Sequence, residues 1–212
     1  LDQLEQNDEI IEQYGRQILV PGISEEGQKN LSYRKVCIIG LGALGTIASQ
    51  YLVRAGIGNI YLIDPDIIEK SNLHRQINYD LKDVGSFKTT ISKEKLKNIN
   101  NISKISTFNE TFENYVKKDK SRFDLIFDCT DNHQNKIFSS QYSKGKFVPF
   151  VSISINSTEG IYFSQNYKKN SSLSCFECLF PQRDQDHRCL NSAMIGPVAG
   201  MVTSLACTKI IF

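Results

Sequence analysis

Three glycines in the stretch VCIIGLGALG, residues 36–45, form the pattern Gly-x-Gly-x-x-Gly at Gly40, Gly42 and Gly45. An apolar run that enters such glycines is typical of a strand, a tight turn and a helix N-terminus that together approach a phosphate. Asp64 follows 19 residues after Gly45, where dinucleotide folds place an acid that binds ribose hydroxyls. The pattern fits NAD, FAD and some ATP sites, and it also fits a turn with no ligand.

Polar residues suited to phosphate chemistry follow Asp64 in the segment SNLHRQ, where Asn72, Arg75 and Gln76 lie within five residues. An Arg side chain pairs bidentately with phosphoryl oxygens, Lys88 in GSFKTT supplies a second point charge, and the two amides can hydrogen-bond the remaining oxygens. Hydride transfer to a nicotinamide has little use for an Arg at this place. For any single member, a solvated basic loop explains the sequence equally well.

An acidic residue, Asp131, follows the apolar run 124–130 in the segment DCTDN. Ligands of open α/β sheets lie beyond the carboxyl ends of the strands, so Asp131 is expected near Gly42 and Asp64. A carboxylate in this position can hold Mg²⁺ between nucleotide phosphates. The alternative is that Asp131 caps the helix expected over 132–144.

Two cysteine features carry possible chemistry. Cys175-x-x-Cys178 has the spacing of half a zinc site, and a structural zinc ion takes four ligands. Cys189 follows His187 and Arg188 and precedes an apolar helix, a setting that can lower the pKa of a thiol and make it nucleophilic. A loop cysteine with no chemistry remains the alternative for Cys189.

Strand-like and helix-like segments alternate over the first 150 residues, which predicts an α/β fold with a Rossmann-like, mainly parallel sheet covered by helices. We expect one domain, 1–212, with a late antiparallel strand over 160–164 and a C-terminal apolar helix. The parallel strands are expected at 35–40, 59–64, 102–108, 124–130 and 147–153. The helices between them are expected at 44–55, 88–98, 109–118 and 132–144, and 165–193 reads as a loop. In the first helix, one apolar face is expected in the core: Ile47, Ala48, Tyr51, Leu52 and Ala55.

Composition excludes several classes of protein. The chain has 212 residues, 40% hydrophobic content and a net charge of +2, which is typical of a globular protein and gives no reason to expect a nucleic-acid or membrane partner. No secretory signal begins the sequence and the six cysteines lack a regular framework, so we expect a reducing, cytoplasmic setting. The apolar segment 194–212 contains Gly196, Pro197 and Lys209, and it is therefore expected to be a helix buried against protein, for example at a subunit interface.

Taken together, the segments GLGALG, LIDPD, SNLHRQ, VGSFK, DCTDN and CFEC followed by GPVAG resemble the ThiF/MoeB/HesA family, relatives of the ubiquitin-activating enzymes. The segments occur in the family's order and extend from Tyr14-Gly15-Arg16-Gln17 to Phe212. The resemblance implies an ATP-dependent adenylyltransferase that acts on the C-terminal carboxylate of a ubiquitin-like sulfur carrier ending in Gly-Gly. A sulfur donor, such as a cysteine desulfurase, would then attack the acyl-adenylate.

The resemblance also implies roles for individual residues. The three glycines approach the phosphates of ATP and Asp64 binds its ribose, while Asp131 holds Mg²⁺. Arg16 reaches the ATP of the partner subunit in a homodimer, and Cys189 joins the activated carrier through an acyl-disulfide. Contacts to the phosphates are implied for Asn72, Arg75, Gln76 and Lys88.

The sequence departs from the family pattern at several places. Ala43 replaces the usual glycine of GLGGLG, which is tolerated only if φ there is negative. The family's second Cys-x-x-Cys is absent before Phe212, so the Zn²⁺ ligand set is incomplete and part of the expected carrier-docking surface is in doubt. Either the natural chain is longer, or this member has lost zinc, or the metal is shared.

Several readings of the function stay open. The segment PQRDQDHRCLNSAMIGPVAG favours thiamine (thiazole) sulfur over molybdopterin sulfur as the pathway. The alternatives are a tRNA-modifying relative, a catalytically silent carrier-binding subunit and an NAD-dependent dehydrogenase.

Overall fold

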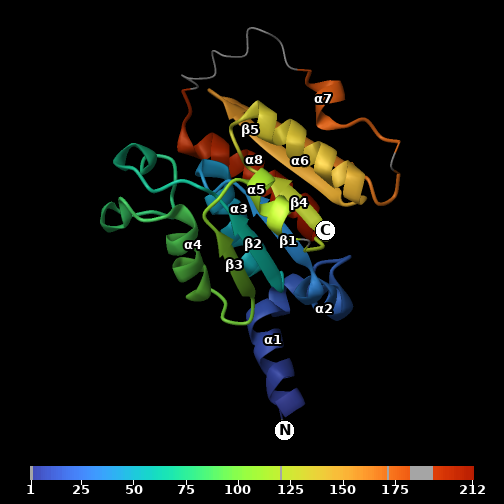
Figure 1. Cartoon of the computed structure of the whole chain (residues 1–212). Coiled ribbons are helices and arrows are strands. Elements are labelled where there is room, and N and C mark those ends of the chain that lie inside the picture. The colour runs from blue at the N-terminus through green and yellow to red at the C-terminus, as the bar shows by residue number, and fades with distance from the viewer. Residues whose placement is uncertain (1, 120, 171, 182–192) are drawn as a thin grey trace.

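A six-stranded sheet forms the centre of the molecule, with the strand order β3-β2-β1-β4-β5-β6 (Figure 1). The computed structural model describes residues 2–119, 121–170, 172–181 and 193–212. The first five strands are parallel, and β6 pairs with β5 in the antiparallel sense. The strands are β1 (Lys35–Ile39), β2 (Asn59–Ile63), β3 (Lys104–Phe108), β4 (Leu125–Asp128), β5 (Pro149–Asn156) and β6 (Glu159–Asn166).

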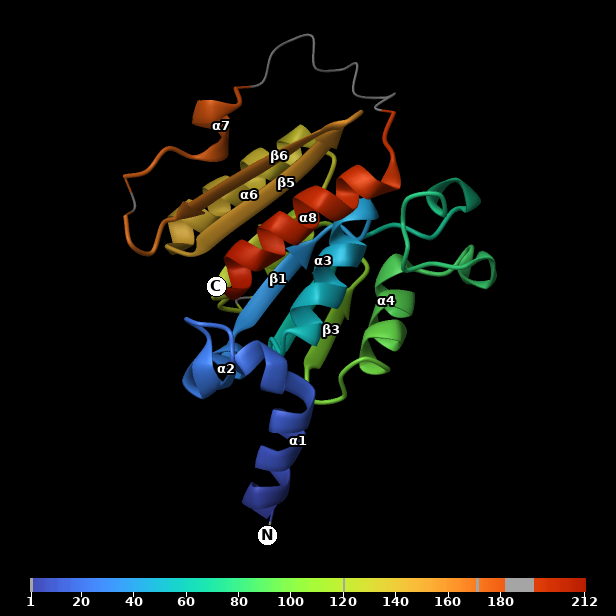
Figure 2. The ribbon, with the colours of Figure 1, turned by 180° about the vertical axis from the view of Figure 1, so that it is seen from behind.

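Helices cover both faces of the sheet, as Figures 1 and 2 show from opposite sides. One face carries α3 (Ala43–Arg54), α4 (Lys88–Lys97) and α8 (Gly196–Ile211), and the other carries α5 (Phe112–Lys118) and α6 (His133–Lys146). The short α7 (Phe176–Leu179) packs on α6. At the N-terminus, α1 (Asp2–Ile18) contacts α2 (Ser24–Tyr33), and two single-turn 3₁₀ helices, η1 (Lys70–Asn72) and η2 (Leu81–Asp83), lie between β2 and α4.

The two-residue periodicity of a strand explains why β1 supplies both layers of the core. Val36 and Ile38 pack in the cluster under α3 and α8, whereas Cys37 and Ile39 pack in the cluster under α5 and α6. Because both faces are covered, the strand reads as a continuous apolar run instead of an alternating one.

Strand order reverses between β1 and β4, which are adjacent in the sheet although β2 and β3 come between them in the chain. We call the edge at which the parallel strands end the carboxyl edge, and the opposite one the amino edge. Open α/β sheets bind ligands in the crevice at the carboxyl edge, where the strand order reverses. The loops after β1, β2 and β4 are therefore placed to form one site.

The predicted fold class is confirmed, including the antiparallel strand β6 and the helix α8. Three expectations about local structure were incomplete or wrong. Residues 165–193 contain the short helix α7, and α1 and α2 had no counterpart among the predicted elements. Tyr51 does not belong to the buried face of α3, because it is 46% exposed, whereas Ala48 and Leu52 are fully buried.

The apolar segment at the C-terminus forms α8, which packs on α3, β5 and β6. In the part of the chain that the structure describes, no helix has the length and apolar character needed to cross a membrane.

Candidate functional site

The glycine loop after β1 brings the sheet and α3 close together. Gly40 has a φ of +85°, which favours glycine, and Gly42 occupies the N-cap position of α3. A Cβ at Gly45 would lie 1.8 Å from the carbonyl oxygen of Gly40, so no larger residue fits there. The backbone amides at the N-terminus of a helix such as α3 are suited to binding an anion. Ala43 begins α3 and is not among the described residues with positive φ, as its methyl group requires.

Asp64 follows β2 and is buried beside this loop. Its Oδ2 accepts a 2.6 Å hydrogen bond from the amide of Leu41, and its Oδ1 accepts a 2.8 Å bond from the amide of Asp66. Burial raises the pKa of Asp64, although the nearby charge of Lys88 and the two amides oppose the shift. Each carboxylate oxygen has two lone pairs, so Asp64 can still accept a hydrogen bond from a hydroxyl.

Residues 65–88 return to the glycine loop and cover its side. The ammonium group of Lys88 lies buried at 2.7 Å from Oδ2 of Asp66. The hydroxyl of Tyr79 donates to the carbonyl of Leu41 at 3.0 Å, and burial raises the pKa of Tyr79, so the phenol keeps its proton. These contacts attach the segment to the end of β1.

Gln76 is buried next to Gly42, where a Cβ on the glycine would lie 3.7 Å from Nε2 of Gln76. Its Oε1 has no hydrogen-bond partner among the described residues. A buried amide oxygen without a partner costs about 1–3 kcal/mol, so the site is short of a donor. Water or a bound ligand could supply it.

The two other polar residues of SNLHRQ have local partners. Oδ1 of Asn72 accepts a 3.1 Å hydrogen bond from the amide of Glu69, which closes η1, and Asn72 is buried. Arg75 is half-buried, and its Nη1 donates to the carbonyl of Ser71 at 2.9 Å. Arg75 can exchange this exposed bond for a ligand. Asn72 uses its carbonyl oxygen in the turn, while its Nδ2 has, within the described part of the chain, only a 3.5 Å contact with Oγ of Ser71 and remains available as a donor.

Asp131 lies at the same edge, in the loop after β4. The backbone of this loop touches the glycine turn, because a Cβ at Gly40 would lie 3.1 Å from the amide nitrogen of Thr130. Asn132, not Asp131, caps α6 by accepting a 3.1 Å bond from the amide of Asn135. The exposed carboxylate of Asp131 is therefore free of the capping role that was its alternative assignment.

Arg16 lies elsewhere, at the opposite end of α3. Its neighbour Gln17 donates to the carbonyl of Ala55 at 2.9 Å, just after the last residue of α3. The 12 residues of α3 span about 18 Å, so Arg16 lies far from Gly42 of its own chain. The structure thus separates Arg16 from the other predicted site residues.

The predicted zinc ligands also lie apart from the glycine loop, at α7. The sulfurs of Cys175 and Cys178 are 3.3 Å apart. Burial alone would raise the pKa of Cys175, but hydrogen bonds from the Cys178 thiol and from the amides of Cys178 and Glu177 lower it below its usual value. Within the described residues, no three His, Cys, Asp or Glu side chains are grouped to hold a metal ion. Two thiols alone do not fit a structural zinc site. Cys189 lies outside the described residues.

Sequence reasoning missed a buried ion pair beneath Asp131. The carboxylate of Asp128 and the ammonium of Lys136 lie 3.3 Å apart, with side-chain exposures of 0% and 4%. It also missed Asp66 and Tyr79. Asp66 is visible in the LIDPD motif, but nothing in the spacing of Tyr79 or Lys136 indicates its partner, because those contacts exist only after folding.

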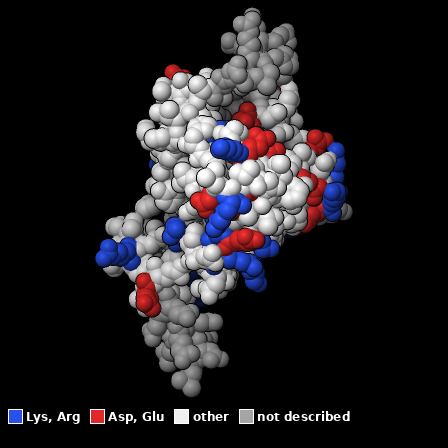
Figure 3. Space-filling view, turned by 90° about the vertical axis from the view of Figure 1, so that its left-hand side faces the viewer, with Lys and Arg blue, Asp and Glu red and all other residues white. Residues whose placement is uncertain are grey.

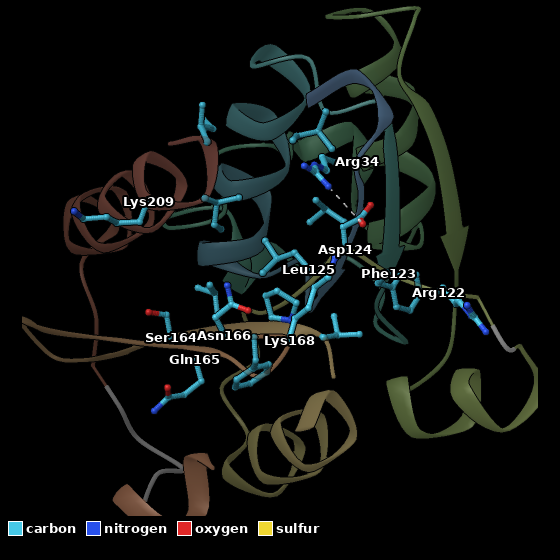
Figure 4. Close-up of a pocket in the computed structure, with 18 of the residues that line it drawn as sticks. Arg34, Arg122, Phe123, Asp124, Leu125, Ser164, Gln165, Asn166, Lys168 and Lys209 are labelled. Carbon is cyan, nitrogen blue, oxygen red and sulfur yellow. Dashed lines mark ion pairs between the residues drawn. The ribbon is translucent and has the colours of Figure 1, made fainter. Parts of the chain in front are cut away.

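A cavity of about 1300 Å³ lies at the amino edge, away from these residues. Figure 4 shows it between the start of β4 and the end of α8, with Lys209 on one side and the Arg34–Asp124 ion pair on the other. This cavity is therefore separate from the carboxyl edge, where the glycine loop and Asp64 lie.

The surface charge agrees with the small net charge. On the side of the molecule that Figure 3 shows, basic and acidic side chains are interspersed. This face presents no patch of a single sign of the kind that binds nucleic acid.

Comparison with known proteins gives a consistent result. The model of the ThiF family matches residues 14–212. An adenylyltransferase and sulfurtransferase of Aspergillus niger is 35% identical over 91% of this chain and 42% of its own length. The sulfur carrier protein ThiS adenylyltransferase of Escherichia coli is 31% identical over 94% of this chain and 79% of its own length. This chain thus spans less than half of the fungal relative.

Solved structures show the same fold. A crystal structure of E. coli MccB with ATP superposes with a TM-score of 0.75 at 26% identity, over 87% of this chain and 56% of that one. The structure of PaaA gives a TM-score of 0.78 at 23% identity. With the glycine loop, Asp64 and Lys88 at the carboxyl edge and the family model matching nearly the whole sequence, the chain belongs to the ThiF family.

Proposed function

We propose that this chain is the adenylating domain of an enzyme that uses ATP to activate the C-terminal carboxylate of a ubiquitin-like sulfur carrier ending in Gly-Gly. The observation that carries this proposal is the convergence of the glycine loop, Asp64, Gln76 and Lys88 at the carboxyl edge of a ThiF-family sheet. The curated relatives are named adenylyltransferases, and one of them is named for a sulfur carrier.

The reaction joins a carrier carboxylate oxygen to the α-phosphorus of ATP. The bond from that phosphorus to the oxygen bridging the β-phosphate breaks, and pyrophosphate leaves with the electron pair. In-line positioning and neutralisation of charge suffice for such a step, since the carboxylate is already a nucleophile.

The residues at the carboxyl edge divide this task. Asp64 accepts from ribose hydroxyls through its remaining lone pairs, and the amides at the N-terminus of α3 face the phosphates. Arg75 and Lys88 neutralise phosphate charge. A phosphate that approaches Lys88 must share it with Asp66, whose side chain is 61% exposed and can move aside.

The unpartnered Oε1 of Gln76 fits a ligand that brings a hydroxyl or a bound water into the site. Asn72 acts through the turn it closes and presents the segment that carries Arg75 and Gln76. Its Nδ2, whose only contact among the described residues is with Oγ of Ser71 at 3.5 Å, can still donate to a phosphate oxygen, so we assign Asn72 both to positioning and to phosphate contact.

Mg²⁺ fits the donor set near Asp131. Mg²⁺ is commonly held by one or two carboxylates together with substrate phosphates and water, and an exposed carboxylate such as that of Asp131 meets this requirement. Asp131 would hold such an ion, which would supply positive charge next to the phosphates.

The test is carrier-dependent exchange of pyrophosphate into ATP. We expect Arg75→Ala and Asp131→Ala to lower exchange by about 10²–10³-fold, because each removes charge stabilisation that acts in the transition state. Lys70→Ala, which removes an exposed cation from the same segment, is the matched control and should keep near-normal exchange. Normal exchange in Arg75→Ala would contradict the assignment.

We assign the carrier to the thiamine (thiazole) branch, on the relative named for ThiS and on the segment before α8. A panel of Gly-Gly carriers from the thiamine, molybdopterin and tRNA-thiolation branches, compared by kcat/KM of exchange, tests this choice. Binding of carrier without exchange would instead indicate a silent subunit, and reduction of NAD with any substrate would indicate a dehydrogenase.

A homodimer is part of the same proposal. Arg16 cannot serve the glycine loop of its own chain, because Gln17 holds the end of α1 at the far end of α3. Exposed apolar side chains on α8, Met201 and Leu205, offer surface for a second copy. Acyl-disulfide formation at Cys189 stays a prediction, as does zinc binding at Cys175 and Cys178, which requires ligands beyond these two thiols.

A further inference from the structure

The loop that carries Asp131 rests on a fully paired, buried network. Oδ1 of Asp128 accepts from the amide of Thr130 at 2.9 Å, from its hydroxyl at 2.7 Å and from the ammonium of Lys136 at 3.3 Å. Oδ2 of Asp128 accepts from the hydroxyl of Ser139. The carboxylate is thus surrounded by donors from its own loop and from α6.

The ammonium group of Lys136 also has a hydrogen-bond acceptor for each of its protons. Besides Asp128, its ammonium donates to the hydroxyl of Ser152 at 3.1 Å and to the carbonyl of Ile153 at 2.8 Å, both on β5. An ammonium group has three protons, so none is left for a ligand. Lys136 therefore joins α6, β4 and β5 at the carboxyl edge without touching the site itself.

Asp131 is held from both sides by this arrangement. The residue before it, Thr130, makes two hydrogen bonds to Asp128, and the residue after it, Asn132, caps α6. The main chain of Asp131 consequently has little freedom, although its side chain is exposed.

Stability alone does not explain a buried ion pair at this place. Desolvation of two charges offsets much of their attraction, and apolar side chains of similar volume often stabilise a protein equally well. What apolar side chains cannot do is hold Thr130 by its amide and hydroxyl. Only an acceptor such as the Asp128 carboxylate can bind both Thr130 donors, and a carboxylate buried at this position needs a cation to offset its desolvation.

We propose that the Asp128–Lys136 ion pair positions Asp131 for the metal-dependent step, and that Lys136 is a positioning residue that never contacts substrate. This inference rests on the proposed function, since it deepens the role of Asp131 there. Loss of the Lys136 charge leaves Asp128 buried without its cation, which releases Thr130 and lets Asp131 move.

The experiment compares the full chain with Lys136→Met, which removes the charge at similar length, and Lys136→Arg, which keeps it. Amide hydrogen exchange of residues 129–135 reports the loop directly, and Mn²⁺ binding in the presence of ATP, followed by electron paramagnetic resonance, reports the carboxylate. We expect faster exchange and about 10-fold weaker Mn²⁺ binding in Lys136→Met, as for other residues that support metal ligands, with recovery in Lys136→Arg.

A buried substitution on a distant strand, Ile105→Ala in β3, controls for lost stability. It should lower Tm without accelerating exchange at 129–135 or weakening Mn²⁺ binding. Equal effects in Ile105→Ala, or wild-type behaviour of both probes in folded Lys136→Met, would overturn the inference.

If Lys136→Met does not fold, two variants of Thr130 test the same positioning of Asp131. Thr130→Val removes the hydroxyl bond to Asp128 and leaves the ion pair in place, whereas Thr130→Ser keeps that bond. We expect Thr130→Val alone to raise the Mg²⁺ concentration needed for half-maximal pyrophosphate exchange, with little change in KM for ATP. If the wild-type chain never catalyses pyrophosphate exchange, the proposed function is refuted. Amide hydrogen exchange of residues 129–135 still tests whether Lys136 positions the loop of Asp131.

Discussion

At the scale of single residues, two features define the candidate site: a position with no space for a side chain and a buried polar atom with no hydrogen-bond partner. Gly45 belongs to the first kind, because a Cβ there would meet the carbonyl of Gly40. Gln76 belongs to the second, because its Oε1 is buried and unpaired among the described residues. The first feature lets the glycine loop pack tightly against the sheet, and the second leaves an acceptor for a donor from water or a ligand.

Gly45→Ala tests the steric requirement. The added methyl group must displace main-chain atoms, so we expect a loss of about 1–3 kcal/mol in unfolding free energy, measured by urea denaturation, and a large loss of ATP affinity. Gly200→Ala is the control, since a Cβ there meets nothing within 4 Å and α8 should gain about 0.5–1 kcal/mol. Wild-type ATP binding by Gly45→Ala would show that the close approach is dispensable.

Residue types and short spacings made the local part of this site predictable. The glycines and Asp64 are separated by the lengths of a turn, a helix and a strand, and the structure places them together. Lys88 was predicted from its residue type and from the family resemblance, and its ion pair with Asp66 brings it near Asp64. Lys136 was not predictable, because its partner Asp128 lies on another element and a lysine within a helical pattern is ordinarily exposed.

At the scale of elements, the segment between β2 and α4 is held at both ends. Lys88 binds Asp66 at one end. At the other, Lys95 on α4 binds Asp80, the N-cap of η2, at 2.6 Å and Asp83, in η2, at 2.8 Å. Burial would raise the pKa of Asp83, but the hydrogen bonds from Lys95 and from the amide of Asp80, with the Lys95 charge, lower it below its usual value. The segment is thus an ordered wall of the site, although the sequence gives it mostly polar residues.

The Asp83 contact predicts a dependence on pH. Because the folded-state pKa lies below the unfolded value, this stabilisation is complete above about pH 4 and is lost as the pH falls through the folded pKa. Asp83→Asn should lower the unfolding free energy by about 1–3 kcal/mol at pH 7, with the difference from wild type shrinking toward pH 3. Thermal unfolding across this range checks it, and a constant difference would show that the charge is not responsible.

Elements were predictable to the extent that apolar periodicity marks them. The parallel strands and α3, α4 and α6 match their predicted ranges closely, because buried runs and helical faces are visible in the residue types. The helices α1 and α2 were not predicted, since their sequences are polar and the order of polar helices depends on contacts such as Gln17 and Gln28 with Ala55.

At the scale of the whole molecule, the separation of Arg16 from Asp131 makes the proposed dimer testable by mixing. In a heterodimer of Arg16→Ala and Asp131→Ala subunits, one of the two composite sites keeps both residues. If subunits exchange freely, the mixture should recover about one quarter of wild-type pyrophosphate exchange, whereas each variant alone stays inactive. No recovery, with heterodimers shown by mass spectrometry, would place both residues in one chain's site.

The strand order has one further consequence, which concerns how the chain folds. β1 pairs with β2, which follows it closely in the chain. Its other neighbour, β4, begins only at Leu125, which lies opposite Val36. Closing so long a loop is slow, so β1, β2 and β3 can associate before β4 joins them. Gly40 belongs to the first half and Thr130 to the second. The crevice proposed here to bind ATP therefore forms only once the last parallel strands have docked. Bound ATP should accordingly slow unfolding more than it speeds folding.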